Sequence, residues 1–355
     1  MQRVTRVAVA AMLAVGLLSS SWVGQAQAGL NFFTSFNDAA LSIDGLGQTG
    51  TGGQIQTSVP SGATVLAAYM YVTTVFSFSG GTFTDVTLRQ GGNSVLLPAA
   101  GGTLLDHANP SFVRRHDVTT FVNNNIASGL QNWVVDEANS SLSNGTVLVV
   151  AYRHSTTTGA TAIIMDGELA LNGDSTTLGF APYMSGAVIM SLASEHSAGG
   201  GQFTTVDVTT SSNSTPRRLS GCAGGFEDGQ LANGALITVG GIGDTTANPG
   251  TAPCADDELY DLSEGNPDNP DAFIAAGDTS LTFLTRNPSN DDNVFFIGIN
   301  AGFRVTDVDD ISTDAPTDDT PSDDGPPPSG VPAPAPLMLL GLGLLAAGIS
   351  RRFRR

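Results

Sequence analysis

Lysine is absent from this 355-residue chain, so arginine supplies every side-chain cation other than a protonated histidine. The 14 arginines are outnumbered by 33 aspartates and glutamates, and the formal net charge is −19. Nucleic-acid binding depends on clustered Lys and Arg that release counterions from phosphate. Arginines adjoin one another only at Arg114–Arg115, at Arg217–Arg218 and within the last five residues. The charge balance therefore argues against nucleic acid as a partner.

Cysteine is almost absent too, because Cys222 and Cys254 are the only two. In an oxidising compartment two cysteines most simply pair with each other. Closing this 32-residue separation stabilises a fold by about 3–4 kcal/mol in the chain-entropy model. We predict the disulfide, and two free buried thiols are the alternative.

Catalytic motifs are missing as well. The sequence has no G-x-S-x-G and no H-E-x-x-H, and its four histidines are scattered at His107, His116, His154 and His196. Gly45–Gly50 matches G-x-G-x-x-G, but the Gly-rich residues that follow are poor helix formers, so a dinucleotide site is not expected. We predict a protein that is not an enzyme; a secreted hydrolase whose residues assemble from distant loops is a less favoured alternative.

Helical periodicity is nearly absent from residues 29–305, whereas short runs of Val, Thr, Ile, Phe and Tyr are broken by Gly, Asn, Asp and Pro. This pattern predicts an all-β ectodomain, an antiparallel β-sandwich of jelly-roll type, built as one sandwich or as two packed sub-sandwiches. Val147–Val150 is expected to be a central strand, and the alternating Thr205–Val208 to face water on one side. Phe112–Val122 is expected to be a strand, and Thr279–Thr285 and Asn293–Val305 to form a closing hairpin.

The first 28 residues have the pattern of a secretory signal peptide. Arg3 and Arg6 precede an apolar run from Val7 to Leu18, and Ala26-Gln27-Ala28 offers small residues for signal peptidase before Gly29. The alternative is an uncleaved membrane anchor, but the apolar run is short for one.

The last 25 residues, 331–355, combine a Pro/Ala segment, a short apolar stretch from Leu337 to Ile349 and an arginine-rich end. The arginines would stay on the cytoplasmic side of a membrane. This tail resembles the PEP-CTERM sorting signal of Gram-negative bacteria, although Ala333 stands where that family usually has Glu. The resemblance implies processing by an exosortase during export; a plain C-terminal membrane anchor is the alternative. The sorting residues are Val331, Pro332, Ala333, Pro334, Arg351, Arg352, Arg354 and Arg355.

Residues 306–330 are rich in Asp, Thr, Ser and Pro and have almost nothing apolar to bury. Repulsion between like charges and the extended preference of proline predict a solvated linker between the body and the tail.

Calcium is the one ligand that the sequence suggests, and no cofactor is required. Hard oxygen donors cluster in two predicted loops, although Asp and Asn also favour ordinary turns, which is the alternative. The candidate ligands are Asp256, Asp257, Glu258, Asp291 and Asp292.

The body also resembles an uncharacterised β-rich ectodomain found in PEP-CTERM proteins. The matching residues are Ile43–Gly47, Val59–Val65 with Tyr69 and Tyr71, Asn233–Gly241, Asp256–Leu262, Asn287-Pro288 and Asp291–Asn293. This resemblance implies a secreted sandwich without a known activity.

Together these features predict a non-catalytic exported protein on the outer surface or in the extracellular matrix of a Gram-negative bacterium. Its expected partners are signal peptidase, exosortase, transiently the inner membrane, and exopolysaccharide or biofilm. A carbohydrate-binding module is the alternative, and its sugar-stacking platform would use Trp133 or the tyrosines Tyr69, Tyr71, Tyr152 and Tyr183.

Overall fold

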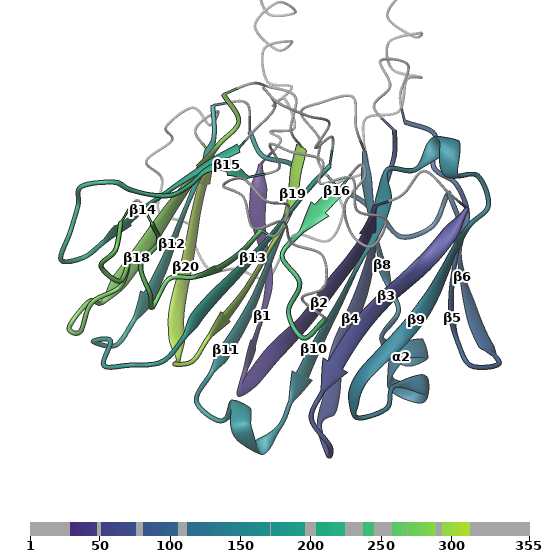
Figure 1. Ribbon diagram of the computed structural model, residues 1–355, viewed down its shortest axis with the longest axis horizontal. Coiled ribbons are helices and arrows are strands. Elements are labelled where there is room, and N and C mark those ends of the chain that lie inside the picture. Colours follow the sequence, from purple (N-terminus) through teal and green to yellow (C-terminus); the bar gives the residue numbers. More distant parts are fainter. Residues whose placement is uncertain are drawn as a thin grey trace, which may run out of the picture. The chain divides into compact units, whose positions relative to one another are not determined.

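The computed structural model describes residues 29–312 except for 48–50, 76–80, 106–111, 171, 196–203, 224–236, 245–257, 268 and 289–292. Within this part the protein is all-β and every strand pairing is antiparallel, as expected (Figure 1). One α-helix interrupts the strands, α2 (Thr119–Asn125), together with two 3-10 turns at Ser140–Leu142 and Ser155–Thr157. No helix in these described ranges is long and apolar enough to cross a membrane.

The described strands form four sheets, which we name A to D. Two of them contain most of residues 39–153. Sheet B runs in the order β2 (Ala39–Gly47), β10 (Gly145–Arg153), β4 (Thr64–Thr73), β8 (Val113–Asp117) and β7 (Thr103–Leu104). Sheet C runs in the order β3 (Gly52–Val59), β9 (Gly129–Glu137), β5 (Val86–Gln90) and β6 (Asn93–Leu97).

The other two sheets contain the strands from residue 161 onward and the first strand of the chain. Sheet A runs in the order β1 (Leu30–Asn37), β11 (Thr161–Gly167), β19 (Asn293–Ala301), β13 (Val188–Glu195) and β16 (Ile237–Val239), and β17 (Leu259–Asp261) also pairs with β13. Sheet D runs in the order β15 (Arg217–Ala223), β14 (Thr204–Thr210), β18 (Ser280–Arg286), β12 (Asp174–Phe180) and β20 (Val305–Ser312).

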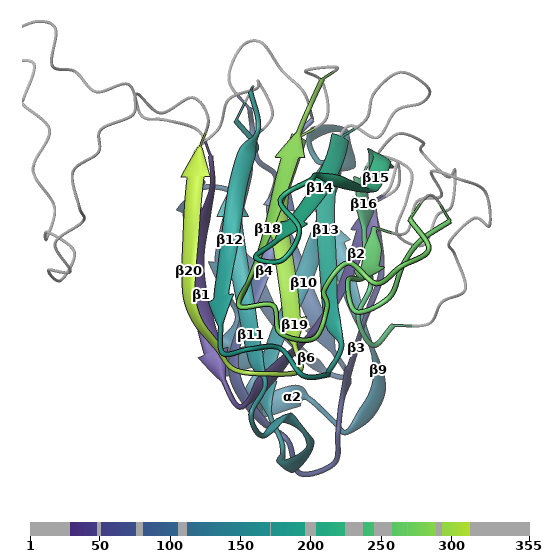
Figure 2. The ribbon, with the colours of Figure 1, turned by 90° about the vertical axis from the view of Figure 1, so that its left-hand side faces the viewer.

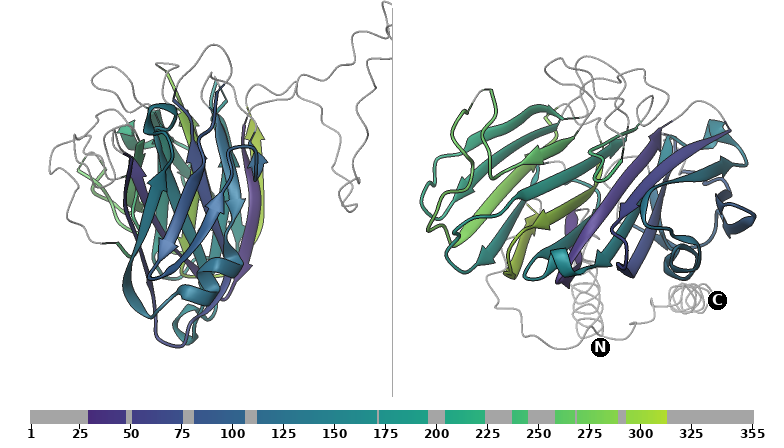
Figure 3. Two further views of the ribbon diagram at one scale, coloured as in Figure 1. Left: turned by 90° about the vertical axis from the view of Figure 1, so that its right-hand side faces the viewer. Right: turned by 60° about the horizontal axis from the view of Figure 1, so that its bottom comes forward.

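Three apolar cores hold the sheets together in the order D, A, B, C, which Figure 1 shows from left to right and Figure 3 shows from an end. The core between D and A includes Phe283 and Ile299, the core between A and B includes Ile164 and Val149, and the core between B and C includes Trp133. Sheets A and B are therefore buried on both faces, which explains why Val147–Val150 is a continuous apolar run in the central strand β10, as predicted.

The strand order is the same in the two halves of the body. In the first half, sheets B and C place the strands as β2-β10-β4-β8 and β3-β9-β5-β6. In the second half, sheets A and D place them as β11-β19-β13-β16 and β12-β18-β14-β15. The repeat is in the topology, because the sequence shows no matching internal repeat.

Strand β1 links the halves, because it precedes the first half in sequence but pairs with β11 of the second. The chain crosses from sheet A to sheet B at Asp38, whose φ of 56° lies in the left-handed region. Its carboxylate accepts hydrogen bonds from the Gly159 N–H (2.8 Å) and from Arg304 (2.8 Å). Asp38 thus ties the two connections between the halves, β1 to β2 and β10 to β11, to the segment between β19 and β20.

Three predicted elements differ from the structure. Phe112–Val122 is not one strand, because β8 ends at Asp117 and α2 begins at Thr119. The predicted closing hairpin is wrong, since β18 pairs with β12 and β14 in sheet D whereas β19 pairs with β11 and β13 in sheet A.

The third difference is at the predicted linker, whose first residues continue the strand β20 along β12. Val308 packs against the core between sheets A and D while Asp307 and Asp309 are outside the core clusters. The body therefore extends to Ser312, and residues 313–330 of the linker lie outside the described part of the chain.

Candidate functional site

Most of the residues predicted from the sequence to carry function lie outside the described part of the chain. These are the signal peptide, all eight sorting residues, Cys254, Asp256, Asp257, Asp291 and Asp292. Cys222 lies in β15, so the predicted disulfide stays a prediction.

The one calcium candidate that is described, Glu258, is buried at 2% exposure and its carboxylate accepts a hydrogen bond from the Tyr260 hydroxyl. Because the other four candidate ligands lie outside the described residues, the calcium site stays a prediction. Within the described ranges, no three His, Cys, Asp or Glu side chains lie close enough together to hold a metal ion.

Two of the aromatic residues proposed as a sugar-stacking platform are in the core. Trp133 is fully buried between sheets B and C, and its indole N–H donates to the Thr57 hydroxyl at 2.8 Å. Tyr71 is fully buried between sheets A and B. Neither ring can meet a ligand, so the platform prediction is wrong for these two. Tyr69, in contrast, is partly exposed and lines a groove.

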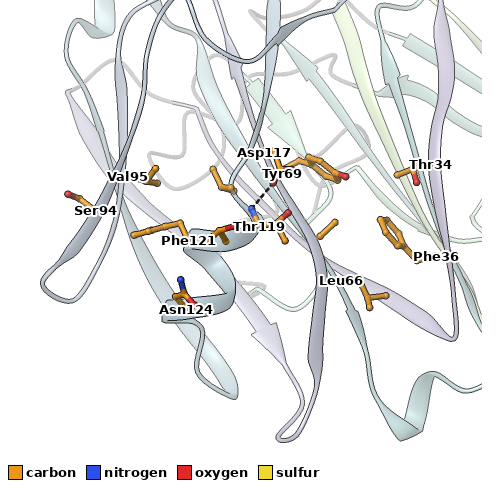
Figure 4. A pocket seen from close by; sticks show the side chains of 13 residues that line it. Thr34, Phe36, Leu66, Tyr69, Ser94, Val95, Asp117, Thr119, Phe121 and Asn124 are labelled. Carbon is orange, nitrogen blue, oxygen red and sulfur yellow. Dashed lines mark hydrogen bonds between the residues drawn. The ribbon is translucent and has the colours of Figure 1, made fainter. Parts of the chain in front are cut away.

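This groove has a volume of about 890 Å³ and is built by elements far apart in the sequence. Strand β1 provides Phe36, β4 provides Tyr69, and the segment from the end of β8 into α2 provides Asp117 and Phe121. Figure 4 shows Phe36 and Tyr69 on one side of β4, and Phe121 with Asn124 on α2 on the other. The groove is therefore an open surface across the boundary between sheets A, B and C.

Asp117 and Thr119 fix the wall of the groove that α2 forms. The Asp117 carboxylate accepts a hydrogen bond from the Thr119 N–H at 2.8 Å, the first residue of the helix (Figure 4). The Thr119 hydroxyl accepts one from the Ala68 N–H at 2.9 Å, which attaches the helix to β4. The N-cap position of α2 is Val118, which makes no side-chain capping bond, so the sequence offers no standard capping signal for this helix.

A buried ion pair lies near Tyr69 of the groove, with its guanidinium carbon 5.9 Å from the centroid of that ring, at the boundary between the halves. Arg115 of β8 forms an ion pair with Asp166 of β11, with side-chain exposures of 14% and 8%. The Tyr71 hydroxyl donates to the same Asp166 carboxylate at 2.8 Å. Burial raises the pKa of Asp166, and the neighbouring Arg115 guanidinium opposes that shift.

The same arginine orders the aromatic side of the groove. Its guanidinium lies 3.3 Å from the centroid of the Phe33 ring, and the rings of Phe33 and Tyr69 meet edge to face at 5.1 Å. Burial raises the pKa of Tyr69, and the Asp117 carboxylate raises it further. The Tyr69 hydroxyl therefore stays protonated and can donate a hydrogen bond.

Histidines show no comparable arrangement in the part of the chain that the structure describes. His116 is buried, and burial followed by the charge of Arg114 lowers its pKa. His154 caps a 3-10 turn, where its Nδ1 accepts from the Thr156 N–H at 3.3 Å. These contacts are structural.

Comparison with known proteins leaves the family open. No protein-family model matches the chain, and no curated protein is similar to it. Among solved structures, the major capsid protein P2 from Bacteriophage PM2 is weakly similar, with 11% identity over 73% of this chain and 97% of that one, and a TM-score of 0.17. A likeness this weak carries no argument about fold or function.

Proposed function

We propose that the chain is a non-catalytic exported protein of the Gram-negative cell surface or extracellular matrix. A PEP-CTERM-like tail sorts it, exosortase and signal peptidase process it, and it associates with extracellular polysaccharide. We further propose that each half of the body is a jelly roll, because each half has two packed sheets with the same strand order.

The observation that supports this proposal is that the two ends of the body meet. The Leu30 N–H donates to the Asp174 carboxylate at 3.0 Å, and Asp174 pairs with Ser312 in the β12–β20 register. Gly167 at the end of β11 has no side chain, and a Cβ there would collide with the Gly29 carbonyl. Figure 2 shows β1 and β20 side by side.

Because the two ends of the body are adjacent, the predicted signal peptide and the predicted linker with its tail join the body close to each other. The signal peptide precedes Gly29 and the linker and sorting tail follow Ser312, so both lead to the same end of the body. Such a body is held at one end, whether by the signal peptide before cleavage or by the tail after it.

Fractionation of the native host with and without its exosortase tests the sorting proposal. With exosortase, mass spectrometry should find an N-terminus at Gly29 and no peptide that contains Arg351–Arg355, and the protein should be at the surface or in the medium. Without exosortase, the intact tail should be present and the protein should fractionate with the inner membrane. An intact tail and one location in both strains would overturn the proposal.

A further inference from the structure

We propose that the groove between β1, β4 and α2 binds a neutral polysaccharide chain, with sugar rings against its aromatic side chains and sugar hydroxyls on Asp117 and Tyr69. The inference rests on the proposed function, because export brings the groove to extracellular polysaccharide. It names a class of ligand and a site that the export signals do not specify.

Apolar contact in the groove comes from three partly exposed aromatic side chains on three elements. Phe36 is on β1, Tyr69 is on β4 and Phe121 is on α2 (Figure 4). Aromatic rings of this kind offer flat apolar area beside polar groups. The apolar faces of pyranose rings, which carry C–H groups, fit that surface. Phe33 and Trp133 hold two of these rings in place, at centroid distances of 5.1 Å to Tyr69 and 6.1 Å to Phe121.

Polar groups with free hydrogen-bonding capacity lie beside those rings. Within the described residues, the Tyr69 hydroxyl and the Asn124 amide make no hydrogen bond, and one Asp117 oxygen is not used by Thr119. A carboxylate accepts from two neighbouring sugar hydroxyls, a tyrosine both donates and accepts, and an amide does the same. Seven of the thirteen lining residues carry a hydroxyl, carboxylate or amide, which favours a polyhydroxylated ligand over an apolar peptide.

Charge selects the class of polysaccharide. Among the described residues that line the groove, Asp117 is the only one with a charged side chain, and the chain as a whole carries 33 acids against 14 arginines. A uronic-acid polymer would bring carboxylates toward this acidic site without a lining cation to pair with them. Neutral sugars meet no such repulsion.

The position of the groove suits a ligand outside the membrane. Leu30, where β1 starts, lies beside Ser312, where β20 ends, whereas the groove is lined by Thr34 and Phe36 toward the other end of β1. Strand β1 has eight residues, a length of roughly 25 Å. Figure 3 shows α2 at the end of the body where β1 finishes. The groove therefore lies toward the end of the body that is away from both termini of its described part.

A glycan array probed with the exported protein purified from its host tests the proposal. The array carries neutral oligosaccharides of glucose, galactose, mannose and xylose, with alginate and hyaluronate oligosaccharides as acidic probes. We expect saturable binding to at least one neutral series and none to the acidic series. Binding to acidic probes only, or to no neutral probe, would overturn the proposal while leaving the fractionation result untouched.

Variants then locate the site. Tyr69→Ala should raise the Kd about tenfold or more, because a tenfold change corresponds to a loss of ~1.4 kcal/mol of binding free energy. Tyr69→Phe and Asp117→Asn retain the packing and should each weaken binding about threefold to tenfold, which keeps the test valid if Tyr69→Ala does not fold. Tyr183→Phe and Asp136→Asn, outside the groove, are matched controls that should bind like the parent. Equal binding by the groove variants and the controls would refute the assigned site.

Discussion

The two halves of the body share one strand order but differ in what joins the strands. In the first half, the connection from β8 to β9 contains α2, which builds one wall of the groove. In the second half, the connection that follows β16 contains β17 and then the turns that place Phe273 and Ile274 in the core between sheets D and A. The same framework thus carries one wall of a ligand-sized groove in the first half and additional core in the second. The surfaces of the two halves differ because the segments that connect the strands differ, and strand pairing does not constrain those segments.

The two halves are also joined to each other, because β1 precedes the first half in sequence but pairs with β11 of the second half. The core between sheets A and B joins the two further, with Ile43 and Tyr71 on one side and Phe296 and Val239 on the other. We therefore expect the body to unfold as one unit.

Core truncations in the two halves should have the largest effects. Trp133→Ala in the first half and Phe283→Ala in the second remove fully buried rings, and each should lower the free energy of unfolding by about 3–5 kcal/mol. Urea denaturation followed by circular dichroism should show one transition that either variant moves. Two transitions, with each variant moving only one of them, would show that the halves are independent.

The free energy of unfolding should depend on pH through Asp44, whose carboxylate accepts a hydrogen bond from the Gln56 N–H of β3 at 2.6 Å. This residue of β2 is buried next to Ile43, which bridges to Ile242 of the second half. Burial raises the pKa of Asp44 to about 8, the Asp244 carboxylate adds to the shift, and the N–H groups of Gln56 and Gly45 oppose it. A folded-state pKa above the unfolded value of 3.8 means that stability is greatest below about pH 4 and is lost as the pH rises toward 8.

Asp44→Asn should remove this pH dependence. The stability of the variant relative to the parent should increase by on the order of 3 kcal/mol between pH 4 and pH 7, measured by urea denaturation at each pH. Asp136→Asn, on an exposed carboxylate, serves as the control. A constant difference between Asp44→Asn and the parent across this range would contradict the assigned origin.

Sequence alone identified the strand content but not the strand partners. The apolar run Val147–Val150 predicted a central strand because burial on both faces removes polar alternation, and β10 is central. In Thr205–Val208, the alternation of polar and apolar residues predicts one solvent-exposed face. Asp207 on that face is nevertheless buried at 8% exposure, because Arg218 and Arg286 form ion pairs with it and cover it. Local alternation shows which residues share a face, and the covering arginines come from neighbouring strands that it does not specify.

The groove was missed for the same reason. The sequence marks Tyr69 only as one of several tyrosines, and Phe36, Asp117 and Phe121 belong to no motif. They meet because β1 pairs with β11, a contact between residues more than 100 positions apart. The polar residues between Thr285 and Asn293 likewise predict a reversal of the chain, but such a composition does not distinguish a hairpin from a crossing between sheets.

The buried ion pair at the boundary should matter less than the cores but more than any surface pair. Arg115→Met leaves the Asp166 carboxylate without its cation and should cost about 2 kcal/mol, because the pair is buried but retains some exposure. Burial raises the pKa of Asp166, so the cost should grow as the pH rises through that pKa. Chemical denaturation at pH 5 and pH 8 measures it, and the double variant with Asp166→Asn should recover much of the loss. An equal cost at both pH values would contradict this account.

The smallest effect should come from the ion pair on the outer sheet of the first half. Arg89 and Asp136 meet at 2.7 Å, the geometry of a good ion pair, but their side chains are 54% and 41% exposed. Water competes for both charges, so Arg89→Gln should change the free energy of unfolding by less than about 0.5 kcal/mol, and 0.5 M salt should erase the difference. The same double-mutant cycle applied to this pair and to Arg115–Asp166 compares an exposed pair with a buried one in a single fold. Equal coupling energies would contradict this account, because they would mean that burial at the boundary does not strengthen an ion pair.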